Sequence, residues 1–235
     1  MSDIAENLAD IRERISAACL RTARDPASIE LIAVSKTFPA EAVRLTIDAG
    51  QVHFGESRLQ EALPKIDLLP GSIHWHFIGR VQRNKVRRIL SSLDVIHAVD
   101  SSDLASYINE LARELGLFPK IFLQVNVAAE SSKGGFDPEV LCAEMESLSI
   151  LDRLEIMGLM CIPPATPDAE SARAWFVVLR DLRDRLERES GVPLPCLSMG
   201  MSGDFEVAIE EGATHVRVGS AIFGHRSYRM DGEPA

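Results

Sequence analysis

The 235-residue sequence lacks the features that mark membrane and secreted proteins. It has no apolar run of 18 residues, and residues 1–10 carry acidic side chains in place of the basic and apolar regions of a signal peptide. Cysteine is sparse, and no C-x-x-C pair occurs. The four cysteines lie among apolar neighbours at Cys19, Cys142, Cys161 and Cys196. We interpret them as reduced core thiols, and we expect a cytoplasmic protein without a membrane partner.

A basic excess is also missing, because 25 lysines and arginines face 35 aspartates and glutamates and leave a net charge of -10. Nucleic-acid phosphates require a dominant basic face, so we expect no nucleic-acid partner. The exposed charge favours a monomer. No Pro/Gly/Ser-rich linker and no abrupt change of composition divides the chain, which favours a single domain.

The sequence does contain a regular alternation of short apolar runs with segments of helical periodicity. The runs that predict strands are 31–35, 53–57, 74–79, 95–99, 120–126, 154–162, 196–200 and 215–219. Helical periodicity is clear in segments such as 39–49, 101–115 and 168–190. Eight strand-then-helix units in this length favour an α/β fold of the (β/α)8 TIM barrel type. An open doubly wound sheet is the alternative, but no G-x-G-x-x-G turn follows an early strand.

An amphipathic helix precedes the first predicted strand. Apolar residues recur at helical spacing from Ile4 to Ile15, and Asp25-Pro26 ends the pattern. The layout that we expect for the single domain, residues 1–235, is an N-terminal helix at 1–24, a barrel at 31–225 and a polar tail at 226–235.

Lys36 closes the first apolar run, Leu31-Ile32-Ala33-Val34-Ser35-Lys36-Thr37. An amine at the end of a buried strand is partly out of water, so its charged form is disfavoured and it can attack an aldehyde to form a Schiff base. A solvated lysine at a strand end is the alternative interpretation. Lys85 and Lys133 are other lysines for this role, but Lys133 lies in a loop after strand five, and a mobile amine is poorly desolvated.

Two loops with glycine and serine follow the last two predicted strands, where barrels of this type often bind phosphate. They are Ser198-Met199-Gly200-Met201-Ser202-Gly203-Asp204 and Val218-Gly219-Ser220-Ala221-Ile222-Phe223-Gly224. Ser202 offers a hydroxyl, and free N–H groups at the helix start after Gly219 would point at an anion. By strand alternation Arg217 shares a face with Gly219 and can point into the barrel mouth. Its alternative role is a buried charge paired with a strand-end carboxylate.

A lysine after the first strand, a phosphate cradle after the last two and an inward arginine together describe a site for a phosphorylated aldehyde. Pyridoxal 5'-phosphate (PLP) is the ligand that these features predict. The prediction depends on the three features occurring together, because a glycine-serine pair is common in ordinary turns.

Motifs spread from residue 33 to residue 224 occur in the order seen in one known family. They are Ala33-Val34-Ser35-Lys36-Thr37, His53-Phe54-Gly55-Glu56, His76-Phe77-Ile78-Gly79 with Gln82 and Asn84-Lys85, Ser132-Lys133-Gly134, Gly158-Leu159-Met160, Ser198-Met199-Gly200-Met201-Ser202, and Val216-Arg217-Val218-Gly219 followed by Ala221-Ile222-Phe223-Gly224. In these stretches the chain resembles the pyridoxal phosphate homeostasis proteins, relatives of the barrel domain of alanine racemase. The resemblance covers nearly the whole chain.

The resemblance implies a one-domain barrel that binds PLP as a Schiff base on Lys36, with Arg217 facing the pyridine nitrogen. It also implies that Ser202, Gly219 and Ser220 lie near the phosphate. The further residues that we assign to the cofactor site are Ser57, His76, Ser198 and Met201. At Ser57 the chain departs from the family pattern, which usually has asparagine, so the contact that asparagine makes to the cofactor is in doubt here.

The role that we expect is that of a carrier and not of an enzyme, so no catalytic residue is assigned. An arginine cannot accept a proton, so it keeps the pyridine nitrogen unprotonated and the ring a weaker electron sink. Related racemases, as the resemblance implies, add a tyrosine base from a second domain, and neither Tyr107 nor Tyr228 is placed like one. We expect intracellular PLP homeostasis and delivery, with PLP-dependent apoenzymes as partners. A PLP-dependent amino-acid racemase of low activity is the alternative.

His74-Trp75-His76, which we place near the end of the third strand, raises a second alternative, a metal-dependent barrel hydrolase. Such sites need further histidines and a carboxylate on later strands. The remaining histidines are His53, His97, His215 and His225. No inward aspartate is evident at strand eight, and Arg217 would repel a cation. We therefore expect no metal site, and we interpret His76 as a polar neighbour of the cofactor ring and His74 as a strand-end residue.

Overall fold

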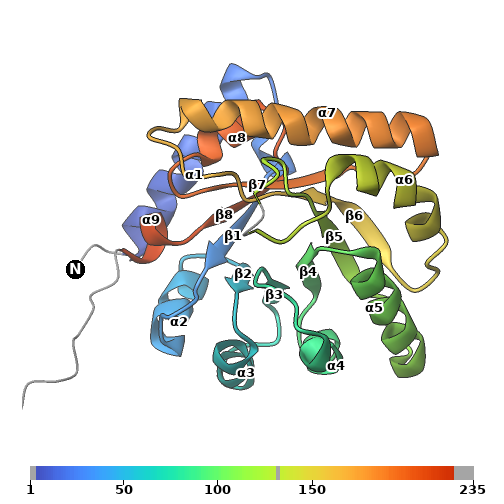
Figure 1. Cartoon of the computed structure of the whole chain (residues 1–235). Helices are drawn as coiled ribbons and strands as arrows, with labels where there is room; N and C mark the ends of the chain where they lie inside the picture. The colour runs from blue at the N-terminus through green and yellow to red at the C-terminus, as the bar shows by residue number, and fades with distance from the viewer. Residues whose placement is uncertain (1–3, 131–132, 225–235) are drawn as a thin grey trace, which may run out of the picture.

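The computed structural model describes residues 4–130 and 133–224, which form a closed barrel of eight parallel strands with helices around it (Figure 1). The strands are β1 (Glu30–Val34), β2 (His53–Glu56), β3 (His74–Phe77), β4 (Val95–Val99), β5 (Lys120–Gln124), β6 (Glu155–Met160), β7 (Cys196–Met201) and β8 (His215–Val218). They pair in sequence order, and β8 closes the barrel against β1, with Ile32 opposite Arg217. The predicted (β/α)8 barrel is confirmed.

The helices lie outside the strands, as the ring of coiled ribbons in Figure 1 shows. They are α1 (Ile4–Arg21), α2 (Ala40–Asp48), α3 (Leu59–Leu68), α4 (Val86–Leu90), α5 (Ser102–Leu115), α6 (Pro138–Ser149), α7 (Arg173–Ser190), α8 (Phe205–Glu210) and α9 (Ser220–Phe223). Short 3-10 turns occur at Pro26–Ser28, Arg83–Lys85 and Glu170–Ala172. The expected N-terminal helix is α1, which packs against α2, α8 and α9.

Helix α7 shows why these segments form helices on the outer face of the barrel. Phe176, Leu179, Leu182 and Leu186 recur every three or four residues and are buried, whereas the charged residues between them form the opposite face. The helix ends at Gly191, whose φ of 71° is left-handed, a conformation that glycine adopts without strain. Burial of this apolar stripe therefore fixes the helix against the sheet.

The interior of the barrel is filled by rings that several strands contribute. His97 of β4 stacks on Phe122 of β5 with 4.5 Å between ring centroids, and Phe122 meets His215 of β8 edge-on at 5.0 Å. Arg217, two residues beyond His215, continues the same inward face toward the C-terminal end. The interior of this barrel is therefore packed and unusually polar, and it is not an open pore.

Three strands end two residues earlier than predicted, because the chain leaves the sheet before the apolar run ends. The predicted strands 74–79, 120–126 and 154–162 end at Phe77, Gln124 and Met160. The residues after them turn into loops at the barrel mouth.

All four cysteines are free, with Cys19 and Cys161 buried and the other two half-buried.

No helix in the part of the chain that the structure describes is long and apolar enough to cross a membrane. Some of the sequence predictions lie outside the described residues, namely residues 1–3 of the predicted N-terminal helix, Ser132, His225 and the polar tail at 226–235 with Tyr228.

Candidate functional site

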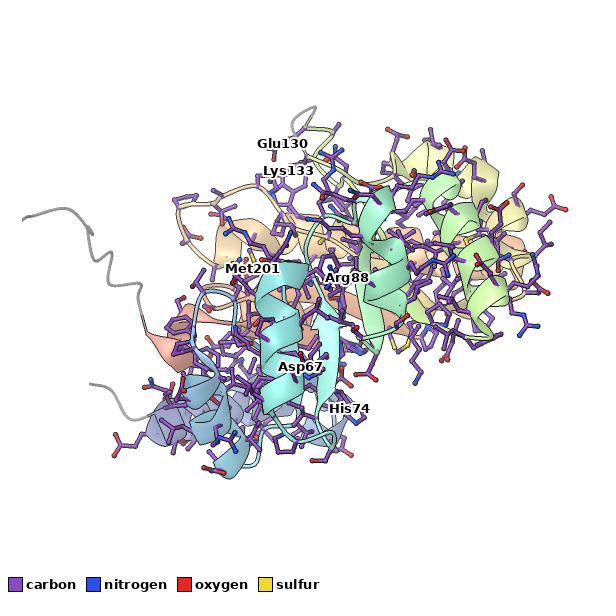
Figure 2. All side chains as sticks on the ribbon, turned by 90° about the horizontal axis from the view of Figure 1, so that it is seen from below. Asp67, His74, Arg88, Glu130, Lys133 and Met201 are labelled. Carbon is purple, nitrogen blue, oxygen red and sulfur yellow. The ribbon has the colours of Figure 1, made fainter. Side chains whose placement is uncertain are left out.

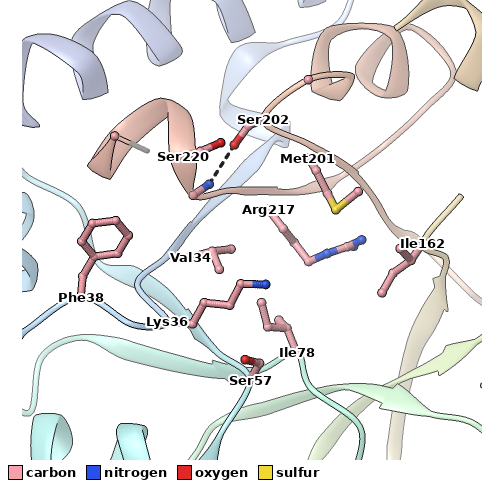
Figure 3. Close-up of a pocket in the computed structure, with 13 residues that line it drawn as sticks. Val34, Lys36, Phe38, Ser57, Ile78, Ile162, Met201, Ser202, Arg217 and Ser220 are labelled. Carbon is pink, nitrogen blue, oxygen red and sulfur yellow. Dashed lines mark hydrogen bonds between the residues drawn. The ribbon is translucent and has the colours of Figure 1, made fainter. Parts of the chain in front are cut away.

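A cavity of about 590 Å³ opens at the C-terminal ends of the strands (Figure 3). Its lining includes seven of the nine residues that the sequence assigned to a cofactor, namely Lys36, Ser57, Met201, Ser202, Arg217, Gly219 and Ser220. Apolar walls come from side chains such as Phe38, Ile78 and Ile162, and Phe38 stacks on Phe223 with 5.0 Å between centroids. The fold thus brings together residues that lie far apart in the sequence, from the ends of β1, β2, β7 and β8.

Lys36 extends into this cavity from the end of β1 (Figure 3). It is half-buried, and among residues 4–130 and 133–224 its amine has no hydrogen-bond or ion-pair partner. The next residue, Thr37, has a φ of 71°, which is rare for a β-branched residue, and its N–H donates to Glu61 Oε2 at 2.8 Å. A strained turn held by α3 therefore follows the lysine just after the end of β1, and the amine stays free of described partners.

A buried polar network that the sequence did not predict holds the ends of β1 and β2 together. Lys65 of α3 donates to Glu56 Oε1 at 2.6 Å and to the Ser35 carbonyl at 2.8 Å, while the Ser35 hydroxyl donates to the same carboxylate at 2.7 Å. Burial raises the pKa of Glu56, and the hydrogen bond from Lys65 opposes that shift. The network fixes the residues immediately before Lys36 and Ser57.

The signal for this network was present in the sequence, because Lys65 follows Leu59 and Ala62 at three-residue spacing on the buried face of α3. A lysine on an apolar face needs a buried partner, and Glu56 at the end of an apolar strand is such a partner.

Arg217 lies opposite Lys36 in the cavity and is only 4% exposed (Figure 3). Its guanidinium donates to Ser198 Oγ at 2.6 Å and to the Cys161 carbonyl at 2.9 Å. The predicted alternative, an ion pair with a strand-end carboxylate, is not found in the described part of the chain. Burial lowers the pKa of Arg217. Since a guanidinium carries five N–H donors, this cation retains donors for an acceptor atom in the cavity.

The two loops predicted to bind phosphate meet at the Ser202 hydroxyl. Its oxygen accepts hydrogen bonds from the backbone N–H of Gly219 at 3.1 Å and of Ala221 at 3.4 Å, and α9 begins at Ser220 between them. The Ser202 loop is held by Asp204, whose carboxylate accepts from the Met201 N–H at 2.6 Å. Backbone donors of one loop therefore converge on a hydroxyl of the other, and the two loops meet at one side of the cavity.

Gly79 explains how Ser57 reaches the cavity. A Cβ atom at residue 79 would lie 2.1 Å from the Ser57 carbonyl oxygen, so only glycine allows the chain after β3 to pass this close to the end of β2. Ser57 supplies a hydroxyl at the position where the sequence resemblance indicates asparagine.

Two predicted site residues, Ser198 and His76, do not line the cavity. Ser198 is fully buried beneath Arg217, and its Oγ also lies 2.9 Å from His97 Nδ1, so its role is to position the guanidinium. His76 lies deeper in the barrel, where its Nδ1 is 3.0 Å from His97 Nε2. Burial lowers the pKa of His76 and His97 well below the usual range, so both rings are neutral.

The placement of His74 and His76 corrects two sequence predictions. β3 runs from His74 to Phe77, so His74 begins the strand and does not end it, and Ile78 takes the mouth position that we assigned to His76. Figure 2 shows His74 and Lys133 at opposite ends of the barrel. The His-x-His pair therefore lies at the N-terminal end, away from the face where barrel enzymes carry their active sites.

The other candidate lysines differ from Lys36 in their surroundings. Lys133 donates to Glu130 Oε1 at 3.0 Å and to the Pro163 carbonyl at 3.1 Å, and it lines a neighbouring cavity of about 240 Å³ (Figure 2). Lys85 closes a 3-10 turn and does not line the large cavity. The guanidinium carbon of Arg83 lies 4.2 Å from the centroid of the Tyr107 ring, and Tyr107 is not part of the cavity lining.

Comparison with known proteins places these residues in a family. The family described as alanine racemase, N-terminal domain, matches residues 3–227. A pyridoxal phosphate homeostasis protein of Pseudomonas aeruginosa is 47% identical over 237 residues, covering 100% of both chains. A protein of the same name from Aquifex aeolicus is 44% identical over 224 residues, covering 95% of this chain and 98% of its own. The chain belongs to the pyridoxal phosphate homeostasis protein family.

Solved structures agree with this assignment. PipY of Synechococcus elongatus, a structure described with PLP bound, is 42% identical and superposes with a TM-score of 0.84, covering 94% of this chain and 100% of that one. The alanine racemase of Clostridium difficile is 19% identical, with a TM-score of 0.74 over 98% of this chain and 57% of its own, and shows the shared barrel fold alone. The resemblance read from the sequence motifs is confirmed.

Proposed function

We propose that the cavity binds PLP. The chain would be a single domain that holds the cofactor and takes part in PLP homeostasis inside the cell. The observation that carries the proposal is the free amine of Lys36 facing the buried guanidinium of Arg217 across one cavity. The structure of PipY described with PLP bound, and the names of the relatives from Pseudomonas aeruginosa and Aquifex aeolicus, support it.

The described residues fit PLP in size and chemistry. A volume of about 590 Å³ lies within the range of roughly 300–1,000 Å³ typical of small-molecule sites. Ser202, Gly219 and Ser220 would hold the phosphate, because they line one side of the cavity where two loops bring hydroxyl and backbone N–H groups together. Arg217 would donate to the pyridine nitrogen, and the apolar walls suit the two faces of an aromatic ring.

Lys36 would hold the cofactor covalently. PLP supplies an aldehyde, which condenses with a neutral amine to give a Schiff base. The amine of Lys36 is half-buried and has no hydrogen-bond or ion-pair partner among the described residues, whereas that of Lys133 is engaged by Glu130 and Pro163. The side chain of Ser57 is shorter than the asparagine that the family pattern has there, so it would reach less far toward the cofactor.

We further propose that the bound cofactor is carried and delivered to PLP-dependent apoenzymes, without robust catalysis. A guanidinium donates to the ring nitrogen and cannot protonate it, which limits how strongly the ring withdraws electrons. Racemization also needs an acid/base on each face of the substrate, and no tyrosine among residues 4–130 and 133–224 lines the cavity. Weak racemase activity is the second candidate. The hydrolase alternative loses its support, because the His-x-His pair lies at the other end of the barrel.

Titration of the purified protein with PLP, followed by visible absorption, tests the proposal. We expect a saturating change with one PLP per chain, lost in Lys36→Ala and retained in the matched variant Lys133→Ala. An unchanged titration of Lys36→Ala would remove Lys36 from the site. Incubation of the loaded protein with L-alanine or D-alanine, with separation of the enantiomers, tests the absence of catalysis, and turnover at ordinary enzyme rates would contradict it.

A further inference from the structure

The N-terminal end of the barrel, opposite the cofactor cavity, carries a cluster of histidines around one carboxylate. Glu30 and His53 are the first residues of β1 and β2, and His76 reaches the same place from β3. None of these side chains lines the C-terminal cavity. The proposed function therefore leaves the cluster without a role.

The spacing of three atoms in this cluster is that of metal ligands. Glu30 Oε1 lies 3.4 Å from His53 Nδ1 and 3.5 Å from His76 Nε2, and the two nitrogens are 3.1 Å apart. Tetrahedral zinc with bonds of about 2.0–2.2 Å requires its ligand atoms to be roughly 3.3–3.6 Å apart. The three atoms thus form one face of a coordination tetrahedron, with the nitrogen pair slightly compressed.

The Glu30 oxygen is unsatisfied in the described structure. It is buried, it accepts no hydrogen bond from any described residue, and no described lysine or arginine lies within ion-pair distance of it. A third imidazole, that of His215, places Nε2 3.3 Å from the same oxygen. A buried carboxylate oxygen surrounded by imidazole nitrogens and without a hydrogen bond is the environment that a cation would complete.

An ion would replace the hydrogen bond between His53 Nδ1 and His76 Nε2, so that both nitrogens present lone pairs to it. This needs the tautomers with hydrogen on His53 Nε2 and on His76 Nδ1. His76 Nδ1–H would then donate to His97 Nε2 at 3.0 Å, and His97 Nδ1–H to Ser198 Oγ at 2.9 Å. Such outer hydrogen bonds fix the tautomer and the ring orientation of a metal ligand.

We propose that Glu30, His53 and His76 form a binding site for a divalent transition-metal ion. Two imidazoles and one carboxylate are a donor set that suits zinc, and a cavity of about 370 Å³ beside them leaves room for water as a further ligand. The ion joins the starts of three adjacent strands. Through His97 and Ser198 its site is connected by hydrogen bonds to Arg217, on the cofactor side of the barrel.

The test measures zinc bound to the full chain without an affinity tag, after removal of metals with a chelator. Competition against a chromophoric chelator should give one ion per chain. Loss of an outer hydrogen-bond partner typically weakens metal binding about 10–100-fold, so loss of a ligand in Glu30→Gln or His53→Gln should weaken it by at least about a hundredfold. The matched control is His74→Gln, since His74 is exposed, lines the same cavity and stacks on His53 at 5.0 Å. The His74 ring makes no hydrogen bond to a proposed ligand among the described residues, so the zinc affinity of His74→Gln should stay close to that of the parent.

X-ray absorption at the zinc edge supplies a second readout, which should show two imidazoles and oxygen ligands without sulfur. Circular dichroism confirms that each variant is folded, and His53→Gln at a strand start serves if Glu30→Gln does not fold. Absence of saturable binding, a sulfur ligand, or equal losses in His74→Gln and Glu30→Gln would overturn the proposal. Because bound metal is measured directly, the result does not depend on whether the other cavity holds PLP.

Discussion

Replacement of Lys65 by methionine tests the buried network that holds the ends of β1 and β2. The side chain of Lys65 is 8% exposed and that of Glu56 is fully buried, and the two are 2.6 Å apart. Removal of one partner of a buried pair costs about 3–5 kcal/mol, because the remaining charge stays buried. At about 2–4 °C per kcal/mol for a chain of this size, the midpoint of thermal unfolding should fall by roughly 10 °C.

Urea unfolding, followed by circular dichroism, measures this loss. The matched control is the double variant Glu56→Gln/Lys65→Met, which removes both charges and keeps an acceptor for the Ser35 hydroxyl. It should regain most of the unfolding free energy that Lys65→Met loses, since no buried charge remains. A single variant as stable as the parent, or a double variant no more stable than the single, would refute the reasoning.

The same pair predicts a pH dependence whose sign can be worked out. Burial raises the pKa of Glu56, against the hydrogen bond from Lys65. A carboxyl with a higher pKa in the folded state contributes stability at low pH, and this stability is lost as the pH rises through the folded pKa. Without Lys65 the pKa should rise further. The loss of stability in Lys65→Met should therefore be larger at about pH 8 than at about pH 5, and a difference independent of pH would contradict this account.

Three further variants test the cofactor side of the barrel. Ser198→Ala removes the acceptor of the buried Arg217 guanidinium, and because hydrogen bonds to charged groups contribute about 1.5–3 kcal/mol, PLP affinity in an absorption titration should fall roughly tenfold or more. Ser202→Ala removes a hydroxyl at the proposed phosphate site and should weaken PLP binding in the same titration, whereas affinity for pyridoxal, which lacks the phosphate, should not change. Gly79→Ala places a Cβ 2.1 Å from a backbone oxygen and should lower the unfolding midpoint or prevent folding, while Gly71→Ala, with no atom within 4 Å, should not. Equal midpoints for the two alanine variants would contradict the close approach.

Much of the fold could be predicted from the sequence, because a parallel barrel imposes a simple pattern. Each buried strand is an apolar run and each outer helix has one apolar stripe, so the order of the eight strands follows from local patterns. The ends of the strands were predicted less accurately than their order. Ile78 and Ile162 continue the apolar pattern although they have left the sheet, because they line a cavity.

The mouth of the barrel was predicted better than its interior. Lys36, Arg217 and Gly219 follow from strand alternation and from glycine in loops, and they meet as expected. His76 was placed too close to the barrel mouth. The alternation along a strand shows which residues face inward, but the depth of each residue in the barrel depends on the register and stagger of the strands. The pair of Lys65 and Glu56 was missed for a related reason, since these two residues are nine positions apart, on a helix and a strand, and meet only in the folded chain.

The most direct test of the central claim is to trap the cofactor. The protein loaded with PLP is reduced with borohydride and digested, and the peptides are mapped by mass spectrometry. The account predicts a pyridoxyl phosphate group on the peptide that contains Lys36, at one per chain. A trapped group on Lys133 or on another lysine, or no trapped group at all, would contradict it.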